Sequence, residues 1–189
     1  MAYFNRGNAY ADKQDYDKAI ADYTQAIRLD PNGAHAYSNR GVAYHTGKGD
    51  YDKAIADYTQ AIRLDPNGAD AYYNRGSAYH TGKGDYDKAI ADYTQAIRLD
   101  PKYANAYNNR GAAYHNGKGD YDQAIADFEA ALRIDPNYAD AYNSRGAAYH
   151  NGKGDYDQAI ADFEAALRID PNHADARNNL DSARQARGY

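Results

Sequence analysis

Four histidines stand at matching places along the chain, and they are the first side chains to test for chemistry. His45, His80, His115 and His150 each follow a tyrosine and are 35 residues apart. A zinc site needs its ligands about 2 Å from one ion, whereas neighbouring helices pack about 8–10 Å apart. Histidines on successive helices therefore cannot converge on one metal. Two interpretations stay open: each imidazole stabilises the end of a helix dipole, or it lines the rim of a binding groove.

A glycine-rich segment, residues 41–48, resembles a phosphate-binding loop only superficially. It reads GVAYHTGK, with five residues between its glycines where the phosphate-binding motif has four. Gly49 follows the lysine, at the place where that motif needs a Ser or Thr to hold the metal ion. We therefore expect no nucleotide at this segment and no cofactor elsewhere.

Enzymatic chemistry and several classes of partner are disfavoured by composition. The chain has no cysteine, which excludes disulfides, thiolate metal sites and cysteine nucleophiles. Near-identical copies of one sequence also make a unique catalytic pocket improbable, so we predict that the protein is not an enzyme. The net charge is −5 with no basic tract, which argues against nucleic acid. No apolar run approaches the roughly 18 residues that span a bilayer, so we expect no membrane association and favour a soluble, cytoplasmic protein.

A segment of 16 residues recurs five times and organises the whole chain. It reads YDKAIADYTQAIRLDP at residues 16–31, 51–66 and 86–101, and YDQAIADFEAALRIDP at 121–136 and 156–171. The prolines that end these copies are 35 residues apart, and the chain has no others. A fixed period of this length is the signature of a stacked repeat array.

Each repeat is predicted to contain two helices, called helix A and helix B below. In the second repeat, the face of helix A carries residues at steps of three and four: Ala36, Tyr37, Arg40, Gly41, Ala43 and Tyr44. The glycines of residues 47–50 predict that helix A ends there in a turn. Asp50 is a suitable N-cap for helix B, and Asp52 adds favourable charge to the first turn. Helix B ends at Asp65, because the residue before a proline avoids the α region.

These residues resemble the tetratricopeptide repeat family. Its pattern W-x2-L-G-x2-Y…A-x3-F…P corresponds in the second repeat to Tyr37, Arg40, Gly41, Tyr44, Ala54, Tyr58 and Pro66. The resemblance covers the whole chain and implies an all-α solenoid of helix-turn-helix repeats wound into a right-handed superhelix. It implies one array of five repeats, at about residues 1–33, 34–68, 69–103, 104–138 and 139–173, followed by a capping helix at 174–189. Arg177, Arg184 and Arg187 are expected to give that helix a polar outer face.

The chain departs from the family pattern in two ways. Four repeats have an extra residue between helix A and helix B, which we expect to leave the stacking faces intact. An arginine replaces the usual leucine in every repeat, at Arg6, Arg40, Arg75, Arg110 and Arg145. Helix B of each repeat carries one aspartate at a fixed position: Asp22, Asp57, Asp92, Asp127 and Asp162. We predict that each arginine lays its stem on the core and pairs with the aspartate of its own repeat.

Asparagines recur within the A helices. In this family, one face of the A helices lines the concave groove. Such a series resembles an asparagine ladder that holds extended peptides, although exposed asparagines are also simply tolerated on a solvated face. The predicted groove residues are Asn5, Asn39, Asn74, Asn109, Asn143, Asn179, Tyr73, Asp70 and Asp140. The aspartates and Tyr73 would favour a ligand that carries Lys or Arg.

A second binding mode of the family is disfavoured. Some members hold a C-terminal carboxylate through lysines, arginine and asparagines on three A helices. The matching residues here are Phe4, Asn8, Asn39, Asp70 and Asn74, of which only the first two asparagines agree with that pattern. Asp70 stands where a cation is needed, so we do not expect an acidic tail as the ligand.

We predict a non-catalytic scaffold that binds a protein or an extended peptide segment of unidentified sequence. The alternative is a structural array, natural or designed, that chiefly associates with copies of itself. Met1 falls near the start of a helix A, as expected for a fragment of a longer protein or an engineered one. The first helix A would then lack a preceding helix B, and we expect weak end-to-end self-association there.

Overall fold

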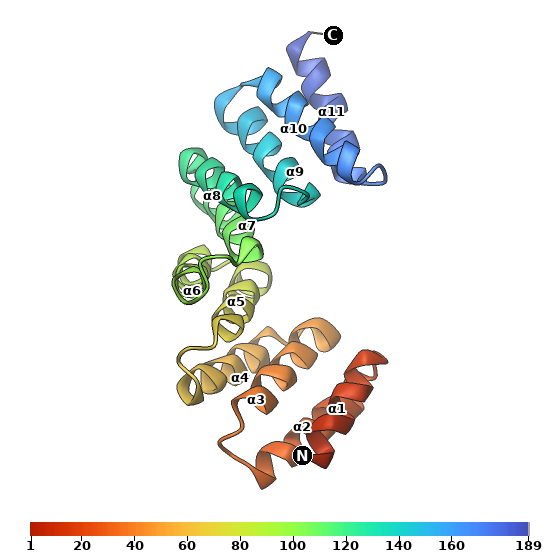
Figure 1. The fold of residues 1–189 in the computed structure, drawn as a ribbon, viewed down its shortest axis with the longest axis vertical. Coiled ribbons are helices and arrows are strands. Elements are labelled where there is room, and N and C mark those ends of the chain that lie inside the picture. Colours follow the sequence, from red (N-terminus) through yellow and green to blue (C-terminus); the bar gives the residue numbers. More distant parts are fainter. Residues whose placement is uncertain (189) are drawn as a thin grey trace. The chain divides into compact units, whose positions relative to one another are not determined.

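The computed structural model describes residues 1–188, and these contain eleven α-helices and no strand (Figure 1). The chain divides into two compact parts, residues 1–100 and residues from Pro101 onward. That the two parts form a single array stays a prediction. None of the helices among the described residues is both long and apolar enough to cross a membrane.

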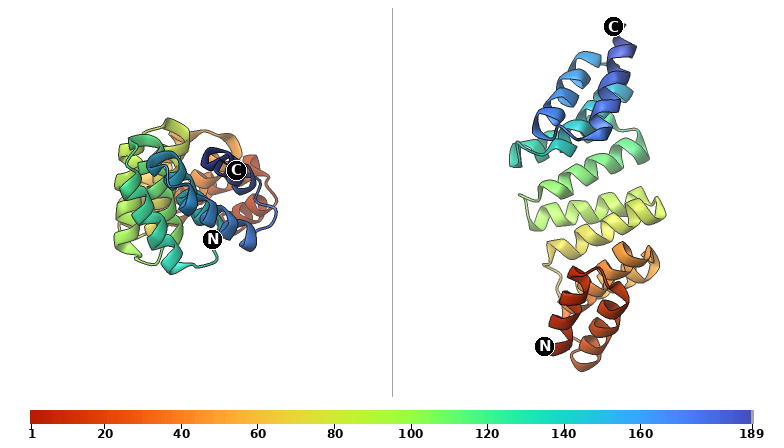
Figure 2. Two further views of the ribbon diagram at one scale, coloured as in Figure 1. Left: turned by 90° about the horizontal axis from the view of Figure 1, so that it is seen from above. Right: turned by 90° about the vertical axis from the view of Figure 1, so that its right-hand side faces the viewer.

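Each repeat forms the predicted pair of helices, and the two helices of a pair fold back on each other as a hairpin (Figure 2). The helices of the N-terminal part are α1 (Ala2–Asp12), α2 (Tyr16–Leu29), α3 (Ala34–Val42), α4 (Tyr51–Leu64), α5 (Ala69–Ser77) and α6 (Tyr86–Leu99). Those of the C-terminal part are α7 (Ala104–Ala113), α8 (Tyr121–Ile134), α9 (Ala139–Ala148), α10 (Tyr156–Ile169) and α11 (Ala174–Arg187). Odd-numbered helices up to α9 are A helices, and α11 is the predicted capping helix.

Every helix B begins at an aspartate N-cap, as predicted for Asp50. The Asp50 carboxylate accepts a hydrogen bond of 3.2 Å from the backbone N–H of Lys53, and it also binds the Lys53 ammonium at 2.7 Å. An aspartate in this position satisfies one of the unpaired N–H groups of the first turn. The same cap occurs at Asp15, Asp85, Asp120 and Asp155.

The core is built from alanines and one large ring per repeat. Tyr23, Tyr58, Tyr93, Phe128 and Phe163 are each at most 2% exposed. Each ring lies directly against the glycine of its helix A: a Cβ at Gly41 would come within 2.7 Å of Tyr58 Cε1. The glycine of the family pattern is therefore needed because helix A passes this close to the ring.

In four repeats helix A ends within the predicted glycine segment, but its last turn is a π-helix rather than a turn that begins at the first glycine. The helical hydrogen bonds continue through the first glycine of this segment, which is Gly47 in the second repeat, as π-helical turns. These turns are named η1 (Ala43–Lys48), η2 (Ala78–Lys83), η3 (Tyr114–Lys118) and η4 (Tyr149–Lys153). A π-turn is wider than an α-turn, so it accommodates the extra residue inside the helix. The helix ends at Lys48, and its C-cap is Gly49, whose φ of 61° is in the left-handed region.

The extra residue also adds contacts between repeats, which the expectation of intact stacking faces did not include. Gly47 lies on the ring of Tyr16 in the preceding helix B, so closely that a Cβ would be 2.2 Å from Tyr16 Cγ. The next residue, Lys48, binds Asp17 of the same helix at 2.6 Å. Equivalent ion pairs join Lys83 to Asp52 and Lys153 to Asp122.

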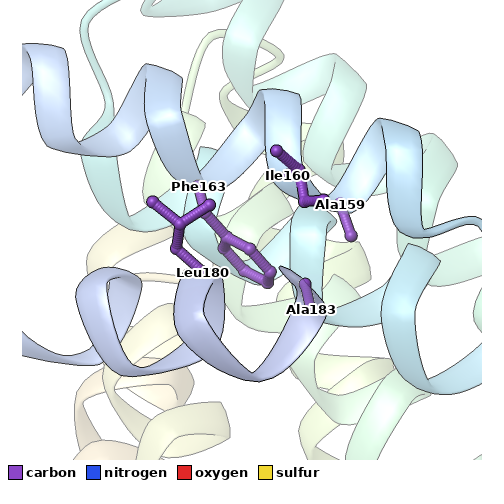
Figure 3. Packing of buried hydrophobic residues seen from close by; sticks show 5 residues of the cluster. All are labelled: Ala159, Ile160, Phe163, Leu180 and Ala183. Atoms are coloured by element: carbon purple, nitrogen blue, oxygen red, sulfur yellow. The ribbon is translucent and has the colours of Figure 1, made fainter. Parts of the chain in front are cut away.

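The capping helix α11 covers the last repeat through an apolar contact. Leu180, which stands where the repeats carry arginine, is 6% exposed and packs with Phe163 and Ala159 (Figure 3). Two of the arginines expected on the outer face are exposed and also form ion pairs with α10. Arg184 lies 2.9 Å from Glu164, and Arg187 lies 2.6 Å from Asp157.

Candidate functional site

A bidentate ion pair fixes each helix A to its helix B, as predicted. In the second repeat, Arg40 Nε and Nη2 each donate to one carboxylate oxygen of Asp57 at 2.8 Å. The Asp57 side chain is 9% exposed and the Arg40 side chain 17%. The prediction is confirmed in all five repeats: Arg6–Asp22, Arg40–Asp57, Arg75–Asp92, Arg110–Asp127 and Arg145–Asp162.

Two of these arginines also reach the preceding repeat. Arg40 Nη1 donates to the hydroxyl of Thr24 in α2 at 3.0 Å, and Arg75 Nη1 donates to Thr59 in α4 at 3.1 Å. The Arg40 guanidinium also lies over the ring of Tyr37, three residues earlier, at 5.7 Å from the ring centroid. The guanidinium is therefore held on three sides. A helix A held in this way presents the asparagine that precedes its arginine at a defined place.

Three predicted groove residues meet at a hollow between α3 and α5. Asn39, Asp70 and Asn74 line it, together with Ser38, Asp65 and other residues, and its volume is about 230 Å³. Among residues 1–188, the side chains of Ser38 and Asn74 make no hydrogen bond. The hollow therefore combines two carboxylates with partly exposed side chains that can hydrogen-bond to a ligand.

A second hollow, of about 380 Å³, lies between α1 and α3. Here the Asn39 amide donates to Asn8 Oδ1 at 3.0 Å, and the Tyr23 hydroxyl donates to the same oxygen at 2.8 Å. The predicted groove residues did not include Asn8 or Tyr23, although Asn8 matches an asparagine of the family's carboxylate-binding pattern. The available signal was that Asn8 is an amide where the second repeat has Val42.

The C-terminal part shows a related pair of asparagines. Asn179 of α11 donates to Asn143 Oδ1 of α9 at 3.0 Å. Asn179 also lines a hollow of about 110 Å³ between these helices. In α7, the Asn108 amide lies 3.4 Å from Asn109 Oδ1.

The remaining predicted residues are placed differently. Asn5 is exposed on α1 and lines neither of the two hollows of the N-terminal part. The ring of Tyr73 lies 5.8 Å from that of Tyr93, centroid to centroid. Asp140 lies 3.1 Å from Nε2 of His173, which precedes α11. Asp140 is therefore engaged by the chain itself.

Each repeated histidine packs against the first tyrosine of its helix B. His45 lies edge-on against the first tyrosine of helix B, with 5.2 Å between the ring centroids of His45 and Tyr51. Burial lowers the pKa of His45, His80 and His115, which favours the neutral ring over the charged form that a helix dipole would stabilise. No group of three or more metal-ligating side chains comes together within the described residues.

Comparison with known proteins matches the repeats to a known family. A family model described as TPR repeat matches residues 7–47, 46–82, 81–117 and 118–152, and one described as Tetratricopeptide repeat matches residues 139–173. No curated protein matches the chain.

Several solved structures are similar to it. The MamA protein is 34% identical with a TM-score of 0.78, over 92% of this chain and 92% of that one. YrrB, described as a TPR protein with an unusual peptide-binding site, is 26% identical with a TM-score of 0.75, over 94% and 90%. The first TPR of Spaghetti (RPAP3), bound to the HSP90 peptide SRMEEVD, is 30% identical with a TM-score of 0.62, over 66% of this chain and 97% of that one.

Proposed function

Because the chain belongs to the tetratricopeptide repeat family, we propose that it is a non-catalytic scaffold whose helix A face binds an extended peptide segment of a partner protein. The observation that carries this proposal is the hollow between α3 and α5, where Asn39, Asp70 and Asn74 meet. Peptide-binding members among the similar structures support the general role.

The proposed ligand is read chiefly through its main chain. A primary amide offers one acceptor and two donors, so Asn74 can bond both the C=O and the N–H of a peptide. Packed helices are about 10 Å apart and an extended chain rises about 3.3 Å per residue. Successive A helices would therefore meet every third residue of the ligand. The Asn39 amide nitrogen is already bonded to Asn8, so Asn39 would contribute its carbonyl oxygen.

The charge of the α3–α5 hollow sets the proposed selectivity. Asp65 and Asp70 line it without any Lys or Arg. The peptide held by Spaghetti contains two glutamates and an aspartate, and such a sequence would be repelled here. We expect a neutral or basic segment, bound weakly and released by salt, because screening weakens exposed charge pairs.

The test is a fluorescence titration with basic and acidic random-sequence peptides of equal length. We expect the basic pool to bind the wild type more tightly, and the Asn74→Ala/Asp70→Asn variant to lose most of that affinity. Asn32→Ala, in an exposed turn that does not line the hollow, is the matched control. Equal affinity of the double variant and the control, or a preference for acidic peptides, would show that this groove is not the site.

The alternative, weak end-to-end self-association, has its own supporting observation. Met1, Phe4, Ala26 and Ala36 line a mainly apolar hollow of about 230 Å³ beside the first helix. A copy of the chain could bury this surface. Light scattering over a concentration series, with and without an added polar N-terminal capping helix, tests it: association that persists unchanged with the cap lies elsewhere.

A further inference from the structure

Two exposed turns between helices contain an asparagine followed by a glycine. They are Asn32-Gly33, which lies between α2 and α3, and Asn67-Gly68, which lies between α4 and α5. Both asparagines are exposed, and within residues 1–188 neither side-chain amide makes a hydrogen bond. Asparagine is one of the thermolabile residue types. An asparagine amide that is open to water and free to rotate is therefore open to chemical attack.

The nucleophile for this attack is the backbone nitrogen of the residue that follows the asparagine. This nitrogen loses its proton and bonds to Cγ of the asparagine, the bond between Cγ and Nδ2 breaks, and ammonia leaves. Water then opens the five-membered succinimide ring and leaves an aspartate or an isoaspartate. A glycine after the asparagine favours ring closure, because it has no Cβ to obstruct the ring and its backbone adopts more conformations.

The fourth repeat contains the same turn without the glycine. In the turn after α4, the C-cap residue Asp65 accepts two backbone N–H bonds, at 3.1 Å from Asn67 and at 3.3 Å from Gly68. The C-cap aspartate of α8 accepts the same two bonds, at 2.9 Å from Asn137 and at 3.3 Å from Tyr138. The two turns therefore share their backbone bonds and differ in the side chain that follows the asparagine.

The C-terminal part contains the same dipeptide inside a helix. Asn116-Gly117 lies in the π-helical turn η3, and Asn151-Gly152 lies in η4. Helical hydrogen bonds hold the backbone there away from the conformation in which the ring closes. Gly152 is also packed against the ring of Tyr121, where an added Cβ would be 2.1 Å from Cγ. Opening a packed helical segment costs more free energy than opening an exposed loop, so these two asparagines should be protected.

We propose that Asn32 and Asn67 are sites of spontaneous deamidation, selected among the Asn-Gly pairs of the chain by the exposed turns that contain them. Each event replaces a neutral amide with a carboxylate. Gly68 lines the α3–α5 hollow together with Asp65 and Asp70, so deamidation of Asn67 would add a negative charge beside it. The hollow would then attract a cationic segment more strongly. This consequence rests on the proposed groove function, whereas the modification itself does not.

The direct test incubates the whole chain at mildly alkaline pH and follows each asparagine by peptide mass spectrometry. We expect Asn32 and Asn67 to deamidate at least about tenfold faster than Asn137 or Asn151. In concentrated urea, which unfolds turn and helix alike, Asn151 should react as fast as Asn67, while Asn137 should stay slow. Gly68→Tyr, which copies the turn of the fourth repeat, should protect Asn67 and leave Asn32 unchanged. Equal rates in the folded chain at Asn67 and Asn151, or at Asn67 and Asn137, overturn the proposal.

A second experiment separates the modification from the groove function. Asn67→Asp reproduces the charge of the product, and Asn137→Asp adds the same charge to a turn that does not line the α3–α5 hollow. We expect Asn67→Asp to raise the affinity for basic peptides by up to about fivefold, as one exposed ion pair can, and Asn137→Asp to leave it unchanged. Equal affinities of the two variants would show that the link to the groove is wrong. If basic peptides do not bind the wild type at all, the groove function fails, and the deamidation rates still decide the modification site.

Discussion

At the scale of single residues, the paired charges decide which changes the fold tolerates. Removing one partner of a buried ion pair leaves an uncompensated charge out of water, which costs about 3–5 kcal/mol. An exposed pair is worth about 0–1 kcal/mol. Helix α4 contains one aspartate of each kind, since the side chain of Asp57 is 9% exposed and that of Asp52 is 81% exposed.

We therefore expect Asp57→Ala to lower the free energy of unfolding by about 3–5 kcal/mol and Asp52→Ala by at most about 1 kcal/mol. Both aspartates contact an arginine or lysine from another helix, so the comparison isolates burial. Urea denaturation followed by circular dichroism measures the difference. Equal midpoints for the two variants would mean that the Arg40–Asp57 pair contributes no more than a surface pair.

Gln14 is the one described residue other than glycine with a positive φ, 59°. It stands where the other repeats have Gly49 and its counterparts, which adopt nearly the same angle. A side chain in the left-handed region costs roughly 1–2 kcal/mol. Gln14→Gly should therefore raise the unfolding free energy by up to about 1 kcal/mol after the added entropy of the unfolded chain is subtracted. Gly49→Gln should lower it, and a gain in stability from that reverse change would contradict the argument.

At the scale of helices, the π-helical last turn of helix A was the part that sequence reasoning could not predict. Gly47 and Gly49 are common turn residues, and nothing in their types distinguishes a turn from a π-helical extension. The choice depends on Tyr16 and Asp17 of the preceding helix B, against which Gly47 and Lys48 pack. That contact is between repeats, and local propensity does not include it.

The pairing of Arg40 with Asp57, by contrast, was predictable. The period sets which helix B follows each helix A, and a charge at a normally apolar position needs an opposite charge nearby. The asparagine bonds were not predictable, because the Asn39–Asn8 and Asn179–Asn143 contacts depend on the rotamers of side chains from neighbouring helices. Period determines which helices meet, and packing determines which side-chain atoms touch.

The histidines at the ends of the A helices should make stability depend on pH. Burial lowers the pKa of His45, His80 and His115 below the ordinary value, which is about 6.5. Below that value the unfolded chain binds protons that the folded chain does not, so stability falls as the pH drops. It levels off once the pH is below the folded-state pKa values.

We expect the unfolding free energy of the wild type to decrease from pH 8 to pH 5.5. The His45→Gln/His80→Gln/His115→Gln variant should show a smaller decrease, even if it is less stable at every pH. The comparison uses slopes, so the lost ring contacts do not affect it. Parallel curves for the two proteins would show that these imidazoles do not titrate differently on folding.

At the scale of the whole molecule, a repeat array is stabilised by each repeat and its nearest neighbours. A destabilising substitution in one repeat should then affect only that repeat and its neighbours. We expect Asp162→Ala, which leaves Arg145 without its partner, to speed amide hydrogen exchange in α9, α10 and α11. Exchange in α1 to α4 should not change. An equal increase in both parts would mean that the chain unfolds as one cooperative block.

The ion pairs between repeats have a consequence for how such a chain can lengthen. Lys48 binds Asp17, and Lys83 binds Asp52 in the same way. An in-frame duplicate of residues 34–68 placed after Gly68 would carry its own lysine for Asp52 and its own aspartate for Lys83. Neither junction would lose a partner, and no compensating substitution would be required. Unequal recombination between such segments can therefore change the number of repeats in one step and still produce a chain that folds.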